Sequence, residues 1–303
     1  NVSILDDPDY INGIHNLIDK TIADYGDVGK KLLWELCKVR IKEYSIYYCS
    51  KINKSRKSQI CILEHRLKSI NCDVEREAII NELKNLYMTS AKGAQIRSRA
   101  KYIADGEKST KYFLSLEKKR QKFNKIEILK CDGKEYTNDQ DLLNIAADFY
   151  DNLYKSCNVN GNDISNYLQK VSNISKLSDE QCASIEGKIS LHEAEIAVKG
   201  LKNNKSPGID GIPAEFYKKF WHKIGNIIIN SFNESYEDCQ LSESQRTSII
   251  SLIFKKGDAR LLQNYRPISL TNCDYKILAF CLANRIQSVI THIINPGQVA
   301  YIK

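Results

Sequence analysis

The chain has 303 residues, of which 42% are hydrophobic and 27% are charged, and its formal net charge is +8 at pH 7. This composition excludes a disordered chain, and the length predicts two domains with a sizeable buried core. No apolar run approaches the roughly 20 residues that a membrane-spanning helix needs. The excess of positive charge favours a polyanionic partner, either a nucleic acid or an anionic membrane surface.

Ten cysteines are scattered along the chain, and no two are closer than eight residues. Structural zinc sites usually contain closely spaced ligand pairs, so we expect no zinc site. The sequence shows no signal peptide, which predicts reduced thiols in the cytosol or nucleus rather than a disulfide scaffold. Because the sequence begins at Asn1 rather than Met, we expect a fragment of a longer protein.

The N-terminal part is predicted to be helical. Proline is absent from Asp9 through Ser206, which permits long uninterrupted helices. Apolar residues between Ile11 and Tyr25 follow a helical period, and those between Trp34 and Tyr44 indicate a second helix. Between Ile60 and Val74 the apolar spacing alternates between three and four residues, as in a helix that packs along a partner. Residues 1–124 are therefore predicted to form a basic helical hairpin or bundle.

The segment 92–130 contains twelve Lys and Arg residues and four Asp and Glu residues, so its net charge equals that of the whole chain. A charge run by itself fits a solvated helix face and a nucleic-acid-binding surface about equally well. The cations that we single out for nucleic-acid binding are Lys108, Lys111, Lys118, Lys119 and Arg120.

Residues 125–176 are predicted to begin with a β-hairpin. The residues Lys125–Lys130 alternate between polar and apolar side chains, as in a strand. Asp132-Gly133 follows, and Asp-Gly is a strong signal for a two-residue hairpin turn.

A helix and a linker are expected after this hairpin. Thr137 or Asn138 can cap a helix that continues to about Tyr154. Residues 155–176 are rich in Asn and Ser, which predicts a linker or a mobile loop.

The last segment, 177–303, is expected to open with a capped helix and a glycine-containing loop. Ser190 and Glu193 have the spacing of a capping box for a helix over Leu191–Leu201. The loop Lys205–Pro213 contains two glycines, which permit a positive φ and a close approach of the backbone to a ligand. It is not a Walker A loop, and alone it is more often a plain connecting turn.

The remaining elements of this segment are two helices, a strand and an amphipathic helix. The helices are expected over 214–221 and 224–236, the strand over 247–254 and the amphipathic helix over 274–294. The apolar side of the amphipathic helix is predicted to comprise Ile277, Cys281, Leu282, Ile286 and Ile290.

A β-hairpin that carries Lys255 and Lys256 near its tip and Arg266 on the returning strand would form a concave cationic site. The planar, permanently charged guanidinium fork of arginine suits phosphate oxygens. Such a site could hold a triphosphate. In isolation, the pattern fits a solvated basic hairpin equally well.

These signals occur together and in one order along the chain. The sequence resembles the polyprotein of LINE-type non-LTR retrotransposons, in the region that leads into and forms the fingers of the reverse transcriptase, an RNA-directed DNA polymerase. The residues 106–114 resemble the pre-polymerase segment of this family, which disfavours an intron-maturase-like polymerase. The other matching segments are 204–211 with 215–217, 253–258, 264–270, 274–278 and 282–286.

The resemblance implies a role for individual residues. Arg266 and Lys255 correspond to the residues that contact the triphosphate of the incoming nucleotide. Lys256 departs from a common family pattern, in which proline follows the lysine, so its role is open. The basic segment would face RNA, in agreement with its charge. The loop residues that the resemblance places close to the template strand are Lys205, Gly208 and Asp210.

Reverse transcription in this family requires palm aspartates that hold two divalent metal ions. The sequence contains no Tyr/Phe-x-Asp-Asp, and Gln298–Lys303 resembles the start of the next family motif. We therefore expect the palm and thumb to be missing. The chain is expected to carry no catalytic residue, metal ligand or cofactor of its own, with Mg²⁺ acting only in the complete polymerase.

The expected fold is mainly α within the α+β class. A long helical hairpin or bundle would be followed by an incomplete fingers subdomain with a β-hairpin. Without a palm, the last helix would leave part of its apolar face uncovered.

The expected function is that of a polymerase fragment, inactive alone, which binds template-primer RNA and DNA and nucleotide triphosphates. It would associate with the rest of its polyprotein and with no membrane, and if expressed it would occur in the cytoplasm and nucleus as a ribonucleoprotein. The alternative is a stand-alone basic helical module that binds RNA or a partner and has no catalytic role.

Overall fold

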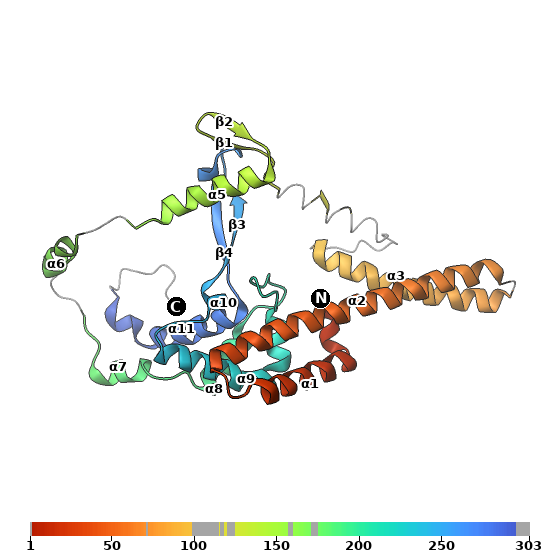
Figure 1. Cartoon of the computed structure of the whole chain (residues 1–303), viewed down its shortest axis with the longest axis horizontal. Helices are drawn as coiled ribbons and strands as arrows, with labels where there is room; N and C mark the ends of the chain where they lie inside the picture. The colour runs from red at the N-terminus through yellow and green to blue at the C-terminus, as the bar shows by residue number, and fades with distance from the viewer. Residues whose placement is uncertain are drawn as a thin grey trace. The chain divides into compact units, whose positions relative to one another are not determined.

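The computed structural model describes residues 2–70, 72–98, 115, 118–119, 125–156, 160–170 and 175–294, with the side chains of 89–98 excepted (Figure 1). The described residues form mainly helices together with two small β-hairpins, which confirms the predicted fold class. The chain divides into two compact units, and each combines segments that are distant in sequence. The first unit comprises Asn1–Ile46, Tyr154–Ser251 and Pro267–Lys303; the second comprises Tyr47–Leu153 and Leu252–Arg266.

The first unit is built around helix α9, Ala214–Glu237. One face of the helix is lined by buried residues that recur at intervals of four, namely Phe216, Phe220, Ile224, Ile228 and Phe232. Two shorter helices were predicted here; the structure shows a single continuous helix. The elements that pack against α9 include the 3₁₀ helix η1 (Val2–Asp6), α1 (Pro8–Tyr25), α8 (Leu191–Gly200) and α11 (Cys273–Ile293).

Helix α1 confirms the first predicted helix but buries a somewhat different face. Asp7 caps it, because its carboxylate accepts a hydrogen bond from the backbone N–H of Asp9 at 3.1 Å. The buried side is formed by Tyr10, Ile14 and Ile18. The predicted face continued to Ile22 and Tyr25, which are 38% and 37% exposed and therefore lie at its edge.

Helix α2 runs without interruption over Lys30–Ser69 and passes from the first unit into the second. Its first part buries Trp34, Cys37 and Ile41, as the helical spacing predicts. The long helix corrects the prediction of separate helices, since neither proline nor glycine interrupts the segment.

In the second unit, the distal part of α2 lies beside α3, Asp73–Ser98. Leu63 of α2 packs with Ile79 and Leu83 of α3 in a buried cluster that Ile60 and Leu67 extend. This contact confirms the prediction that the segment forms a helix that packs along a partner helix.

The end of the predicted pattern was wrong, because α2 stops at Ser69. Val74 belongs to α3 instead, where it is 79% exposed.

The predicted hairpin around Asp132-Gly133 is present. β1 (Leu129–Cys131) pairs antiparallel with β2 (Lys134–Tyr136). Asp132 and Gly133 both have a positive φ, 50° and 78°, which is the conformation of a tight two-residue turn. The strand begins at Leu129, four residues later than predicted, so the alternation before it belongs to a non-strand segment.

Helix α5, Asp139–Tyr154, follows this hairpin and confirms Asn138 as its cap, since Asn138 Oδ1 accepts from the N–H of Gln140 at 2.9 Å. A small core joins Leu129, Leu142 and Leu262.

The predicted linker, 155–176, contains helix α6 (Gly161–Lys170), which was not predicted and buries none of its residues. Helix α7 (Asp179–Ile185) follows after the linker. Asn160 lies just before α6 and its side chain accepts from the N–H of Asn162 at 3.1 Å, so asparagine here starts a helix.

Helix α8 begins as predicted. Ser190 accepts from the N–H of Glu193 at 3.3 Å, while Glu193 accepts from the N–H of Ser190 at 2.9 Å, which completes a capping box. Arg285 of α11 donates to Glu193 at 2.5 Å and to the carbonyls of Gly187 and Lys188 at 2.8 Å. Hydrogen bonding to Arg285 lowers the pKa of Glu193 to about 2. This arginine therefore fixes the turn before α8 against α11.

The buried face of α11 differs from the predicted one. Ile277, Cys281 and Val289 are buried, whereas Leu282 and Ile286 are 44% and 48% exposed. Part of the apolar surface of this helix is therefore uncovered, as expected.

Candidate nucleotide and nucleic-acid site

The predicted cationic hairpin is present. It consists of β3 (Ile249–Phe254) and β4 (Tyr265–Leu270). The N–H of Lys255 donates to the carbonyl of Asn264 at 2.9 Å, which places Phe254 across from Tyr265. The rings of these two residues confirm that register, since they meet edge to face with their centroids 5.5 Å apart.

The same register places Lys255 and Arg266 on one face of the hairpin. Side chains alternate between the two faces of a strand, so residues two apart share a face. Phe254 and Tyr265 form a cross-strand pair, and Lys255 and Arg266 each directly follow one of them, Lys255 just beyond the end of β3. Phe254 and Tyr265 therefore occupy the opposite face, and the two cations can act on one ligand.

Lys255 and Arg266 are available to such a ligand, as is the neighbouring Lys256. All three side chains are exposed, and within the described part of the chain they form no hydrogen bond or ion pair. Arg260, in the loop between the strands, behaves differently because it is fully engaged with neighbouring acids.

Arg260 organises the tip of the hairpin. Its guanidinium binds Asp258 at 2.9 Å and Glu135 of β2 at 2.7 Å. Hydrogen bonding to Arg260 lowers the pKa of Asp258 to about 2. Asn264 closes the loop by donating to the carbonyl of Asp258 at 2.9 Å.

Sequence reasoning did not identify Arg260. Asp258 lies only two residues before Arg260, so an ion pair between them could have been inferred from the sequence. The partner Glu135 is 125 residues away, and no spacing rule reveals such a contact.

Of the three predicted residues in the loop after α8, only Lys205 is exposed. Gly208 and Asp210 are buried and hold the loop against the start of α11. A Cβ at Gly208 would lie 2.5 Å from the backbone nitrogen of Asn272, so only glycine fits there. The contact of these residues with nucleic acid stays a prediction, but burial gives Gly208 and Asp210 a structural role.

The basic segment is described only in part. Lys118 and Lys119 are helical and exposed. The predicted nucleic-acid-binding residues Lys108, Lys111 and Arg120 lie outside the described residues.

Sequence reasoning also missed a buried polar cluster in the first unit. Asp274, at the start of α11, has no solvent-exposed surface. Its Oδ2 accepts hydrogen bonds from Trp34 Nε1 at 2.8 Å and from Lys38 Nζ at 3.0 Å, and Gln245 donates to it at 3.3 Å. The N–H of Tyr275 donates to Oδ1 at 2.7 Å. The cluster thereby connects α2 to α11 within the unit.

Lys38 has further partners, which balance its charge. It is 4% exposed and lies 2.7 Å from Glu35, and it also donates to Ser244. Glu35 in turn accepts from Ser242 at 2.6 Å. Two carboxylates thus surround one buried ammonium group, and the hydroxyl groups of Ser242 and Ser244, at the start of α10 (Glu243–Arg246), complete the network. The geometry is that of a structural ion-pair network, since Lys38 and Asp274 are buried and bind each other.

Asp210 gives the first unit a pH dependence that can be measured. Burial raises the pKa of Asp210 from its usual 3.8 to about 6. Because the folded pKa is the higher one, the protonated form stabilises the fold below about pH 3.8, and this contribution is lost as the pH rises through 6. We expect Asp210→Asn to flatten the pH dependence of the unfolding free energy between pH 4 and 6, measured by urea denaturation. Identical profiles for the variant and the wild type would contradict this assignment.

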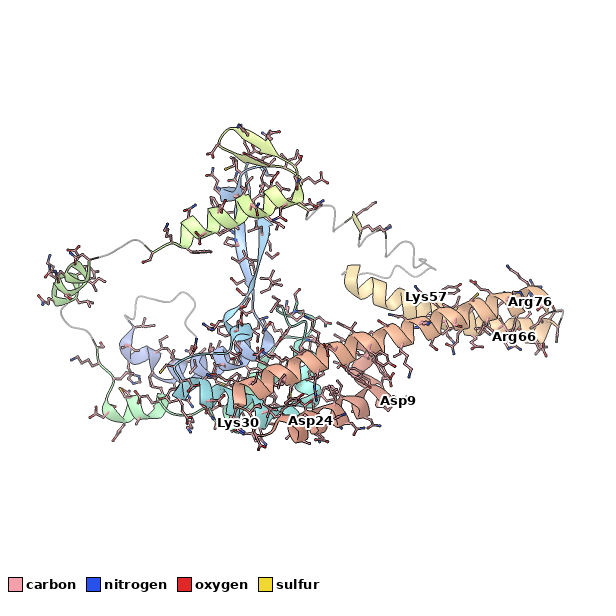
Figure 2. The ribbon with its side chains drawn as sticks, viewed as in Figure 1. Asp9, Asp24, Lys30, Lys57, Arg66 and Arg76 are labelled. Carbon is pink, nitrogen blue, oxygen red and sulfur yellow. The ribbon has the colours of Figure 1, made fainter. Side chains whose placement is uncertain are left out.

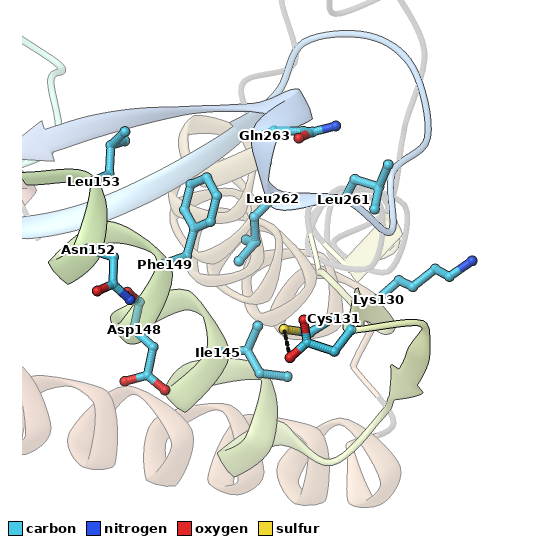
Figure 3. A pocket seen from close by; sticks show the side chains of 11 residues that line it. Lys130, Cys131, Ile145, Asp148, Phe149, Asn152, Leu153, Leu261, Leu262 and Gln263 are labelled. Carbon is cyan, nitrogen blue, oxygen red and sulfur yellow. Dashed lines mark hydrogen bonds between the residues drawn. The ribbon is translucent and has the colours of Figure 1, made fainter.

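A separate pocket lies in the second unit, between α5, β1 and the loop 261–263 (Figure 3). It has a volume of about 650 Å³, with Ile145, Phe149 and Leu262 at its apolar base. Asp148 and Asn152 line its polar side. Its lining includes Cys131, whose thiol donates to Asp132 Oδ2 at 3.8 Å (Figure 3). Desolvation and the Asp132 carboxylate raise the pKa of this thiol, which disfavours the nucleophilic thiolate. None of the predicted site residues contributes to this pocket.

No group of three or more His, Cys, Asp or Glu residues is placed to hold a metal ion in the described part of the chain. A helix long and apolar enough to cross a membrane is also absent from the described residues.

Comparison with known proteins finds a similarity to a transposon protein. It is 31% identical over 285 residues to the "Transposon TX1 uncharacterized 149 kDa protein" of Xenopus laevis. The chain is related to a transposon protein. This match covers 92% of the chain and 21% of the TX1 protein, so the chain spans about a fifth of its relative. No family model matches the chain.

Proposed function

We propose that this transposon-related chain is part of a retrotransposon RNA-directed DNA polymerase that binds template-primer RNA and DNA and the incoming nucleotide triphosphate. Two independent findings support the proposal. The motif order along the sequence resembles the fingers of such polymerases, and the similarity to the TX1 protein extends over 92% of the chain.

The observation that carries the proposal is the arrangement of the β3–β4 hairpin. Lys255 and Arg266 lie on one face, exposed and free of acidic partners within the described residues. A triphosphate presents several anionic oxygens, and Arg266 can bind two of them with its planar fork. Lys255 would add a compact point charge beside it.

The tip of the hairpin supports this role because its loop is already ordered. Arg260 is held by Asp258 and Glu135, so the backbone between the two strands is fixed before a ligand arrives. A cationic site with a fixed frame loses less conformational entropy on binding than a mobile loop does. Nucleotidyl transfer itself is assigned to no residue of this chain.

The test is the Arg266→Ala variant in the full chain. Loss of one charge-assisted contact of about 1.5–3 kcal/mol should weaken binding of a nucleoside triphosphate roughly 10- to 100-fold. Affinity for RNA should change little. Equilibrium dialysis with a radiolabelled triphosphate and fluorescence anisotropy with labelled RNA measure the two affinities.

Arg246→Ala is the matched control, because Arg246 is also exposed and has no partner among the residues that the structure describes. It should leave both affinities unchanged. If Arg266→Ala weakens triphosphate and RNA binding equally, or if both variants behave alike, the role of Arg266 is wrong.

The alternative function is a stand-alone basic helical module that binds RNA or a protein partner. The α2–α3 pair favours it, since this helical hairpin has its own buried cluster around Leu63, Ile79 and Leu83. The alternative predicts RNA binding without any saturable binding of triphosphate. The dialysis measurement on the wild-type chain therefore separates the two functions.

A further inference from the structure

The distal part of α2 carries cations that neither the predicted basic segment nor the hairpin accounts for. From Tyr44 through Leu63 the chain contains Lys51, Lys54, Arg56 and Lys57 and no acidic residue. All of these cations belong to the second unit and lie on one continuous helix (Figure 2 labels Lys57).

The helix period separates these cations from the apolar cluster. With 3.6 residues per turn, Lys51 and Lys54 lie opposite the line of Leu63 and Leu67 that packs on α3, and Lys57 lies on its flank. The three lysines are exposed, whereas Arg56, on the packed side, is only partly exposed. We call Lys51, Lys54 and Lys57 the α2 cationic face.

The charges of this face are not balanced by the protein. In the described part of the chain, none of its three lysines forms a hydrogen bond or ion pair. The first part of α2 differs, because Lys31 binds Asp238 at 2.5 Å and Lys38 binds Asp274 at 3.0 Å. Like charges on successive turns of a helix repel one another by a few tenths of a kcal/mol. A face that keeps them without acidic neighbours is suited to an anionic ligand.

The structure favours nucleic acid over a membrane as that ligand. A helix that binds a membrane surface inserts its apolar side among the lipids. The apolar side of α2 is instead occupied, since Leu63 is 6% exposed and packs on α3. The exposed apolar residues nearest the cationic face are Ile46, Tyr47 and Ile62, which are too few to form the continuous apolar side of a membrane-binding helix.

The spacing of the lysines matches a regular row of phosphates. Six residues of helix between Lys51 and Lys57 extend about 9 Å. A nucleic-acid duplex carries one negative charge for about every 1.7 Å of its axis, so this length meets several phosphates. Successive lysines are three residues apart, so the charges turn by about 60° at each step, and the rigid helix holds them on one broad, curved face. We take a duplex as the ligand, because its phosphates form an equally regular array that winds around an axis.

We propose that the α2 cationic face binds the phosphate backbone of a nucleic-acid duplex without reading its sequence. It forms a contact separate from the triphosphate site of the β3–β4 hairpin. The inference deepens the proposed function and rests on it in taking a nucleic acid as the ligand of the chain.

The test uses the full chain with Lys51→Gln, Lys54→Gln and Lys57→Gln combined. Binding of a fluorescein-labelled 20-base-pair RNA duplex is followed by anisotropy as a function of NaCl concentration. Each phosphate contact contributes about 0.9 to the slope of log affinity against log salt, so the slope should fall by about 2 to 3. Affinity at 0.1 M salt should fall at least tenfold. Glutamine is a good helix former, so helix content measured by circular dichroism should be unchanged.

The matched control removes the same charge from exposed lysines elsewhere, Lys20, Lys155 and Lys176, which have no partner in the described residues. This triple Gln variant should keep the wild-type slope. If the two triple variants show equal slopes, the effect is one of net charge and the proposal is overturned. A labelled single strand that loses as much affinity as the duplex would overturn the duplex assignment.

Two further readouts separate this inference from its alternatives. Triphosphate binding by the α2 variant should equal that of the wild type, so failure at Arg266 and failure at α2 can be told apart. The second readout is binding of the wild type and the α2 variant to vesicles that contain phosphatidylserine. If the α2 variant loses vesicle binding while its affinity for the RNA duplex is unchanged, the face binds membranes and the proposal is wrong.

Discussion

Asp274→Ala should lower the unfolding free energy of the chain by about 3–5 kcal/mol, the cost of removing one partner of a buried ion pair, although Glu35 remains beside Lys38. Lys38 is 4% exposed and would lose the carboxylate that now lies 3.0 Å away. Trp34 and Gln245 would lose their acceptor as well. Removing one partner of a buried pair costs more than removing the whole pair, so the effect should be among the largest of any single substitution.

Urea denaturation followed by tryptophan fluorescence measures this loss, and Trp34 reports directly because its indole N–H binds Asp274. Asp19→Ala is the control, because it removes the exposed carboxylate that pairs with Lys223 at 2.6 Å. Exposed pairs contribute about 0–1 kcal/mol. Equal losses in the two variants would show that the Asp274 network does not hold α2 to α11.

Gly208→Ala should cost about 3 kcal/mol or more, because overpacking against backbone forces a shift. The added Cβ would lie 2.1 Å from Asn272 Oδ1 and 2.5 Å from the Asn272 backbone nitrogen. The side chain cannot rotate away from a backbone atom, so the loop before α9 or the start of α11 must move. Urea denaturation measures the loss, and hydrogen exchange should show faster exchange at the N–H of Asp210, which donates to Asn272 at 3.3 Å.

Gly161→Ala provides the comparison, since no atom lies within 4 Å of its Cβ position and its φ needs no glycine. It should be neutral or slightly stabilising. If Gly208→Ala is as well tolerated as Gly161→Ala, the close packing of the loop on Asn272 is wrong.

The fold class and the local signals were predictable because they depend on residues close together in the sequence. The capping box of Ser190 and Glu193 and the Asp132-Gly133 turn each involve neighbours within four positions. The continuity of α2 was harder to predict. Its apolar spacing changes where the helix leaves the packing of the first unit for that of the second, and the change imitates a helix end.

The division into compact units follows from contacts between distant segments, which composition does not reveal. Trp34 and Lys38 contact Asp274, more than 230 residues later. A domain boundary drawn along the sequence therefore separates helices that share one buried network. The first part of α2 is integral to the unit that contains α9 and α11.

The sequence predicted which cationic residues the candidate site contains, but not which of the neighbouring residues are buried. Two apolar strand-like runs on either side of a short basic loop predicted a hairpin that carries Lys255 and Arg266, and the register places both on one face. The buried positions of Gly208 and Asp210 could not be predicted, because they depend on Asn272 filling the space beside them. The same limit applied to Arg260, whose partner Glu135 lies on another hairpin.

The most direct test of the nucleotide site is to locate the bound triphosphate. A nucleoside triphosphate with a photoreactive group on its γ-phosphate is irradiated with the full chain, and the modified peptide is identified by mass spectrometry. The account predicts labelling within Ile249–Leu270, suppressed by an excess of unlabelled triphosphate and reduced in the Arg266→Ala variant. Labelling that lies outside this hairpin, or that unlabelled triphosphate does not suppress, would contradict it.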